Sequence, residues 1–428
     1  MANILDYLDW RGDITFDQSP FNEVDNLILA ELSFVPLRGI VPEHAAEGTI
    51  SLHEAAERYF STQWDEKVSL GLIVPSVIFT LFRKTSECRR YRDIALTAFV
   101  DHIDLDLQKQ FAAITALIDD QQAYLSFRGT DDTLIGWKEN FNMGVLEAVP
   151  SQKEAVAYVN EVAGAISHPT LYIGGHSKGG NLAIYAAIHA DEQIKPRIAH
   201  VYSNDGPGYR SEVVASACYT EMQERIETIV PQSSVVGRLL EHDNRYRVVL
   251  SNASGLWQHD GFSWQVVGTH FVEAEALSKE SEMIDRSLKK WIADMDDEKR
   301  EKFIDSLYRV LTATNAKTLT ELTKDRNWLW KMLRNSDSTS RKTVLESLAQ
   351  LTGEAGRLWV ESILPAWTKS KPAAEETVLE ERNEKVEPVG KIATPAPAKK
   401  LPAKRKAEAS MISVKPKKSA TRPANKSK

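Results

Sequence analysis

Apolar and polar residues follow two periodicities along the first two thirds of the chain. Apolar runs of strand length recur between about residues 112 and 251, and stretches with apolar residues three or four positions apart separate them. Several runs lack polar alternation, as is typical of parallel strands buried on both faces. The predicted strands are Ala112–Leu117, Ala123–Phe127, Thr170–Gly174, Ile198–Ser203, Arg225–Val230 and Tyr246–Ser251.

Helical spacing fills the intervals between these strands. Lys153–Ile166 and Asn181–His189 each lie between two successive strands, which predicts βαβ units. Upstream, a short helix is expected around Leu27–Phe34, packed on the main domain, and Val68–Leu107 is expected to be mainly helical. The pattern predicts an α/β fold with an open, mostly parallel sheet flanked by helices.

The last third of the chain changes character twice. After Phe271 the apolar positions are purely helical in spacing to about Trp367, and beyond Ser370 the composition shifts to Lys, Pro, Ala, Glu and Ser without aromatic residues. Such a segment cannot bury enough apolar surface to order itself. We therefore expect three parts. They are an α/β domain over 1–271, a helical region over 272–370 packed on or following it, and a disordered tail over 371–428.

Charge separates the tail from the rest. Residues 391–428 hold 12 Lys and Arg against one acid, a charge of +11, and the preceding residues hold 41 against 59, a charge of -18. A basic tail of this kind attracts nucleic-acid phosphates or an anionic membrane surface without reading sequence. The simpler interpretation is a solvated extension.

The whole chain has the composition of a globular protein. The 428 residues are 42% hydrophobic, and the N-terminus lacks the basic and apolar regions of a signal peptide. No segment is apolar for the length that would span a bilayer. Two cysteines, Cys88 and Cys218, provide neither a disulfide framework nor a cysteine metal site, so a cytoplasmic location is expected.

A glycine-flanked serine follows the strand at Thr170–Gly174. Gly175-His176-Ser177-Lys178-Gly179 lies between that strand and the helix that follows it, which is the order of a nucleophile elbow. A sharp turn presents the serine hydroxyl to a base, and small residues on either side let strand and helix approach. The alternative is a phosphate-binding turn at a helix N-terminus. Neither of the usual glycine-rich phosphate motifs is present.

An oxyanion hole needs one donor after the nucleophile and a second from an earlier loop. The Lys178 amide is the first candidate. The second is Thr130, through its backbone or its hydroxyl, in Phe127-Arg128-Gly129-Thr130 after an earlier strand.

These motifs resemble the class 3 triacylglycerol lipases and, more closely, a bacterial family of uncharacterised lipase-like α/β hydrolases, over residues 1 to about 325. The resemblance implies the α/β-hydrolase fold and an oxyanion role for Thr130. The residues that carry it are Trp10-Arg11-Gly12-Asp13, Pro20-Phe21-Asn22-Glu23-Val24-Asp25, Phe127 to Leu134, Gly175 to Ala183, Asn204-Asp205-Gly206-Pro207-Gly208 and Gln258-His259-Asp260.

The catalytic base of this fold follows the last strand. His259 lies just beyond Tyr246–Ser251, where the base belongs. His242 precedes that strand, and His270 is expected at the start of the next helix. His176, beside the nucleophile, is expected to point away from the pocket and to pack.

The acid departs from the class 3 lipase pattern, which has an Asp before a Val-Pro pair. Here Val230-Pro231 has no such carboxylate, and Asp205, at the end of the preceding strand, is the candidate instead. Asp243 and Glu241 are the alternatives. Asp205 could equally close an Asx turn, since Asp-Gly-Pro-Gly is good turn chemistry on its own.

The sequence thus predicts a serine hydrolase, with its catalytic domain over 1–271, that cleaves a small acyl ester or a lipid through a Ser-His-Asp triad. Such chemistry needs neither a metal nor an organic cofactor. A second hypothesis is a catalytically silent α/β-hydrolase scaffold that binds a ligand or partner.

Overall fold

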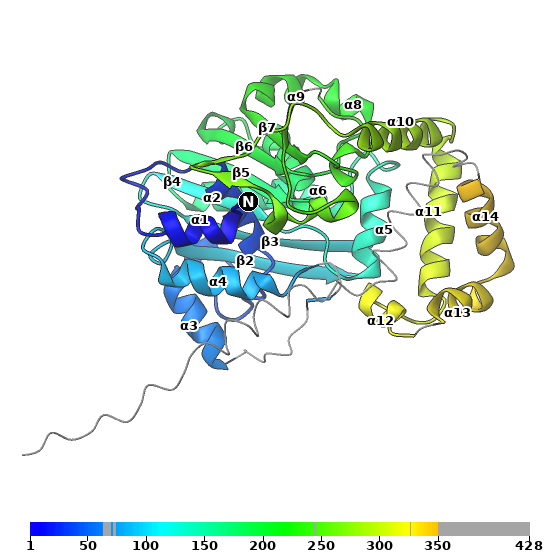
Figure 1. Cartoon of the computed structure of the whole chain (residues 1–428), viewed down its shortest axis with the longest axis horizontal. Coiled ribbons are helices and arrows are strands. Elements are labelled where there is room, and N and C mark those ends of the chain that lie inside the picture. Colours follow the sequence, from blue (N-terminus) through cyan, green and yellow to red (C-terminus); the bar gives the residue numbers. More distant parts are fainter. Residues whose placement is uncertain (63–69, 72–73, 244, 326, 350–428) are drawn as a thin grey trace, which may run out of the picture. The chain divides into compact units, whose positions relative to one another are not determined.

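The chain folds around a mixed sheet whose strands are ordered β1 to β8 as in the sequence (Figure 1). The computed structural model describes residues 1–62, 70–71, 74–243, 245–325 and 327–349. The strands are β1 (Ile50–Ser51), β2 (Ala95–Asp104), β3 (Lys109–Leu117), β4 (Gln122–Phe127), β5 (Thr170–His176), β6 (Ile198–Asn204), β7 (Ile226–Pro231) and β8 (Tyr246–Val249). A separate pair, β9 (Val266–Val267) and β10 (His270–Phe271), is antiparallel.

Strands β1 to β4 pair antiparallel, and β4 to β8 pair parallel. Each parallel connection steps to the next strand in the same direction, and such crossovers are right-handed, so their helices gather on one face. Apolar side chains of the crossover helices form a single core with that face. These helices are α6 (Pro150–Ala165), α7 (Lys178–His189), α8 (Ser211–Val214) and α9 (Ala217–Met222). The predicted α/β-hydrolase fold is confirmed.

The N-terminal helices cover the opposite face of the sheet. They are α1 (Ile4–Arg11), α2 (Glu23–Leu32), α3 (Leu52–Thr62) and α4 (Val77–Glu87), and they share a second core with the strands. Every residue of α2 is buried. The helix begins at a capping box, in which the Asn22 side chain accepts from the Asp25 amide and the Asp25 carboxylate accepts from the Asn22 amide. The expected short N-terminal helix therefore lies inside the domain.

The expectation of a mainly helical segment over Val68–Leu107 is wrong in its second half. Residues Ala95–Asp104 form β2, which pairs with β3. The register shifts between Thr97 and Val100, and Ala98 has a φ of 51°. A bulge of this kind interrupts the alternation of period two that identifies a strand, so the sequence pattern does not predict a strand here. Residues 63–69 and 72–73 lie outside the described residues.

Among the described residues, five helices follow Phe271: the first packs on Val235, and the other four share a core with Leu134, just after β4. They are α10 (Lys279–Ala293), α11 (Asp297–Thr312), α12 (Leu319–Thr323), α13 (Trp328–Asn335) and α14 (Ser338–Ala349), and the helix after β4 is α5 (Leu134–Asn142). Helix α11 contacts α5 (Figure 1).

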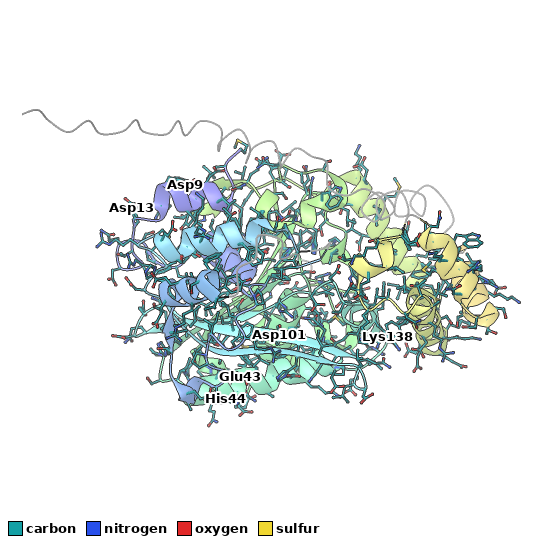
Figure 2. The ribbon with its side chains drawn as sticks, turned by 90° about the horizontal axis from the view of Figure 1, so that it is seen from below. Asp9, Asp13, Glu43, His44, Asp101 and Lys138 are labelled. Carbon is teal, nitrogen blue, oxygen red and sulfur yellow. The ribbon has the colours of Figure 1, made fainter. Side chains whose placement is uncertain are left out.

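Two kinds of contact join this helical region to the sheet domain. Leu134 shares a core with α11, α12 and α13, and its amide donates to the Lys317 carbonyl at 2.9 Å. Lys138, labelled in Figure 2, pairs with Asp305 of α11 at 2.7 Å.

The chain divides into two compact units, Met1–Ser370 and Lys371–Lys428. The predicted tail over 371–428 and the end of the predicted helical region lie outside the described residues. Within the described ranges no helix has both the length and the apolar character needed to cross a membrane.

Candidate active site

Ser177 occupies the turn between β5 and α7 in a strained backbone conformation, with a φ of 58° and a ψ of -131°. The glycines around it are required by contact with β4. A Cβ at Gly179 would lie 2.0 Å from the Phe127 carbonyl oxygen, and one at Gly175 would lie 2.5 Å from the same atom. The turn presents the serine side chain at the N-terminus of α7, where helix amides and their partial positive charge are available to an anion.

A buried amide network supports the elbow from below. The carbonyl of Asn204 accepts from the Ser177 amide at 2.9 Å, and the Asn204 side chain donates to the Gly175 carbonyl at 3.1 Å. Asn26 of α2 donates to the Asn204 side chain at 3.0 Å and accepts from Tyr124 at 2.8 Å. Neighbouring groups of this kind over-determine a strained residue and hold it in place.

Asp205 and His259 are hydrogen-bonded to each other. The Nδ1 atom of His259 lies 2.6 Å from Oδ2 of Asp205, and the side chain of Asp205 is 0% exposed. The other carboxylate oxygen accepts the Ser234 hydroxyl at 2.5 Å. Asp205 adopts a φ of 50° directly after β6. Each oxygen of the acid therefore has its own donor, which fixes the plane of the carboxylate and, with it, the His259 ring.

The second nitrogen of the His259 ring, Nε2, forms no hydrogen bond among the described residues. Within the described part of the chain, the Ser177 hydroxyl makes no hydrogen bond to His259. Catalytic hydrogen bonds are often long in ligand-free structures and tighten when substrate is bound. The His259 side chain is 23% exposed, so the ring borders solvent where a substrate would enter.

The loop after β4 passes against the nucleophile. A Cβ at Gly129 would lie 3.2 Å from the Ser177 Cβ and 2.8 Å from the His176 carbonyl oxygen. The next residue is Thr130, whose hydroxyl oxygen accepts from the Asn140 amide at 2.6 Å. Because this bond uses a lone pair, the hydroxyl proton of Thr130 stays available to donate.

The amide of Lys178 starts α7 and has no partner within that helix. Lys178 directly follows Ser177, and Thr130 directly follows Gly129, which lies against the Ser177 side chain.

The side chain of Lys178 is a feature that the sequence did not reveal. It is 1% exposed, and its ammonium pairs with Glu139 at 2.5 Å and donates to the Gln110 carbonyl at 2.5 Å. Glu139 also accepts from the Ser151 amide at 2.8 Å. Burial lowers the pKa of Lys178, and the Glu139 charge opposes this shift. A buried ion pair with satisfied hydrogen bonds anchors the residue after the nucleophile to α5.

The two alternative acids lie in other surroundings. Asp243 accepts from Gln223 at 2.5 Å and pairs with Arg245 at 3.0 Å. Glu241 lies 3.9 Å from Lys289. Among the described residues, neither carboxylate contacts the His259 ring.

The remaining histidine candidates also lie elsewhere. His242 is partly buried, and this burial, with Arg238 and Lys289 nearby, lowers its pKa to about 3. His270 does not begin a helix as expected but lies in β10, exposed, with Nδ1 3.6 Å from Glu23. The pattern misled there because a two-residue strand is too short to show any period.

A parallel sheet with a strained serine elbow after a central strand, next to an Asp-His pair, defines a lipase-like member of the α/β-hydrolase class. The family model described as Mbeg1-like matches residues 85–309. The chain belongs to the Mbeg1-like family.

Comparisons with individual proteins add little to this. No curated protein matches the chain. A similar solved structure is that described as "Crystal structure of M37 lipase". It is 11% identical, covers 49% of this chain and 68% of that chain, and has a TM-score of 0.32.

Proposed function

We propose that this protein is a serine hydrolase that cleaves acyl esters through Ser177, His259 and Asp205. The observation that carries the proposal is the 2.6 Å bond between the His259 ring and the buried Asp205, beside a serine held in an elbow. A structural histidine on a surface loop has no need of a fully buried carboxylate with a second donor. The constellation is the one that acyl transfer uses on many folds.

The reaction proceeds in two halves. The His259 Nε2 takes the Ser177 proton as the serine oxygen attacks the acyl carbon, and the imidazolium is stabilised by Asp205. The proton then passes to the departing alcohol, which leaves an acyl-serine. Water, activated by the same ring, attacks the acyl carbon, and the serine recovers its proton.

The oxyanion of each tetrahedral intermediate is assigned two donors. These are the Lys178 amide at the start of α7 and the Thr130 hydroxyl or amide. Because they are held by Glu139 and Asn140 of one helix, they need little reorganisation as charge develops. The substrate class is a small acyl ester or a lipid.

Hydrolysis of p-nitrophenyl esters of increasing chain length tests this function. The account expects turnover that disappears in Ser177→Ala and a preference among chain lengths. Turnover that survives in folded Ser177→Ala would contradict it. Rates on dispersed and on monomeric esters would separate a lipase from an esterase.

A second candidate is a catalytically silent scaffold that binds a ligand. It is favoured by the absence of a hydrogen bond between Ser177 and His259 among the described residues. In that case the wild-type protein would turn over no ester, and Ser177→Ala would leave ligand binding unchanged.

We also propose that the basic segment 391–428 adds a sequence-independent attraction to polyanions, on the strength of its charge of +11. Removal of 391–428 should weaken retention on duplex DNA or on anionic vesicles at low salt. A loss on DNA would indicate nucleic acid as the partner, and a loss on vesicles would indicate an anionic membrane surface. Equal retention of the full and shortened proteins on both would remove this proposal.

A further inference from the structure

A buried histidine lies directly behind the loop that carries His259. His176 is the last residue of β5, and its Nε2 lies 2.7 Å from the backbone carbonyl oxygen of His259. The two rings lie 4.7 Å apart, centre to centre. Because β5 is a central strand paired on both sides, this bond ties the short helix Gly255–His259 to the most rigid part of the site.

The protonation of His176 follows from its surroundings. Burial lowers the pKa of His176 to about 3, and the neighbouring His259 ring acts in the same direction. The imidazole is therefore neutral and carries one proton. At 2.7 Å from a carbonyl oxygen, Nε2 must be the donor, which leaves Nδ1 as an acceptor.

Glu31 of α2 faces that acceptor. Its Oε1 lies 3.3 Å from the His176 Nδ1, and a Cβ at Gly261 would come within 2.7 Å of the same oxygen. Burial raises the pKa of Glu31 well above its ordinary value, and the charge of Asp260 adds to the shift. This oxygen is buried and has no hydrogen-bond partner among the described residues, and a neutral carboxyl group is able to donate to Nδ1. Among the described residues, the charged or titratable groups facing Glu31 are His176, Asp260 and Tyr124.

We infer that Glu31 and His176 are positioning residues that hold the backbone of the general base. The Glu31 carboxyl contacts Nδ1 of the His176 ring at 3.3 Å, and Nε2 of the same ring donates a hydrogen bond to the His259 carbonyl. Asp205 sets the orientation of the His259 ring, and this second chain sets the position of its main chain. Together they determine where Nε2 stands relative to Ser177. The inference rests on the proposed function, in which His259 is the base.

Replacement of His176 tests the chain directly. His176→Leu keeps most of the volume and removes the donor, whereas His176→Gln places an amide N–H near the former Nε2. The readouts are the rate constant for labelling of Ser177 by a fluorophosphonate, and kcat and KM on a small ester, with thermal unfolding to establish folding. His189→Leu, at the far end of α7, is the matched control.

His176→Leu should lower the labelling rate and kcat by roughly 10²-fold at unchanged KM, because a displaced base is costly at the transition state. His176→Gln should recover most of the loss, and His189→Leu should match the wild type. Equal rates in folded His176→Leu and wild type would overturn the inference. A folded His176→Gln variant that is labelled no faster than His176→Leu would also overturn it.

Glu31→Gln adds a pH test. The amide still donates to Nδ1 but cannot ionise. In the wild type, loss of the Glu31 proton at high pH turns the His176 tautomer and withdraws its donor from His259. Labelling by Glu31→Gln should therefore persist to higher pH than that of the wild type. If the labelling rates of the wild type and Glu31→Gln fall in the same way at high pH, the proposed role of Glu31 is contradicted. If the wild type is not labelled at all, both the proposed function and this inference fail. If labelling is lost in Ser177→Ala but is unchanged in the variants of His176 and Glu31, the inference alone fails.

Discussion

Gly179 in the first turn of α7 lies against the backbone of β4, so that a Cβ at Gly179 would stand 2.0 Å from the carbonyl oxygen of Phe127. Strand and helix cannot both keep their places around any larger residue. The elbow at Ser177 depends on this close packing, because the same carbonyl oxygen also leaves no room for a side chain at Gly175. The tight packing of two glycines against one carbonyl is what allows a serine to be held at a positive φ.

Gly179→Ala should therefore destabilise the fold by about 1–3 kcal/mol and abolish ester turnover. Urea unfolding and p-nitrophenyl ester hydrolysis measure the two effects. Gly164→Ala is the control. It lies in α6, a Cβ there meets nothing within 4 Å, and it should be neutral or stabilising by roughly 0.5–1 kcal/mol. An active Gly179→Ala enzyme would show that the approach is not needed.

Asp205→Asn should lower kcat by roughly 10³–10⁴-fold, because the amide cannot hold the His259 tautomer or stabilise the imidazolium. Asp243→Asn, a change of the same kind at the rejected acid, should stay within about twofold of the wild type, since surface changes away from a site have small effects. Steady-state kinetics on a short-chain ester measure both. The opposite ranking would return the role of acid to Asp243.

Thr130→Val should lower kcat by about 10²-fold with little change in KM, because an oxyanion donor acts chiefly in the transition state. Thr320→Val removes a buried hydroxyl that has no hydrogen-bond partner among the described residues and should leave kcat unchanged. If Thr130→Val instead raises KM at constant kcat, its hydroxyl contacts bound substrate and not the oxyanion.

Lys178→Met should destabilise the protein by about 3–5 kcal/mol, because it leaves Glu139 buried and unpaired. The double variant Lys178→Met with Glu139→Leu should recover part of this loss. Recovery stays partial, since Glu139 also accepts from the amides of Gln110 and Ser151. Urea unfolding of the wild type, the two single variants and the double variant gives the coupling free energy between Lys178 and Glu139. Additive losses would mean that the two side chains do not interact.

Acid should destabilise the fold through its buried and partly buried histidines. Burial lowers the pKa of His242 from the ordinary value of 6.5 to about 3, so the unfolded chain takes up a proton in this interval that the folded chain does not. The stabilising contribution is therefore complete above pH 6.5 and is lost as the pH falls toward 3, by about 1.4 kcal/mol per pH unit. His242→Gln should flatten the stability profile between pH 6 and 4 by this slope. An unchanged slope would show that His242 is protonated in the native state.

Much of the fold could be predicted from sequence because six strands appear as short runs rich in apolar residues, and Ser177 lies where one of them meets a helix. Strand β2 was missed because its bulge at Ala98 breaks the period of two. The roles of Glu31 and Glu139 could not be predicted. An acid in a helix indicates a solvent face, and only the packing of α2 and α5 shows that both carboxyl groups are buried.

The partners of the acids depend on contacts between distant segments. Asp205 meets His259 across 54 positions of chain, and Glu139 meets Lys178 across 39. A local pattern indicates which residue types suit a triad, whereas only the tertiary fold shows that Asp205 contacts the His259 ring.

The most direct test of the central claim is the site of modification by a fluorophosphonate probe. Intact-mass analysis of wild-type protein should show a single adduct, and peptide mapping should place it on Ser177. Ser177→Ala should take up no probe, and Asp205→Asn should react more slowly by orders of magnitude. A folded wild-type protein that stays unmodified, or one modified on a residue other than Ser177, would contradict the account.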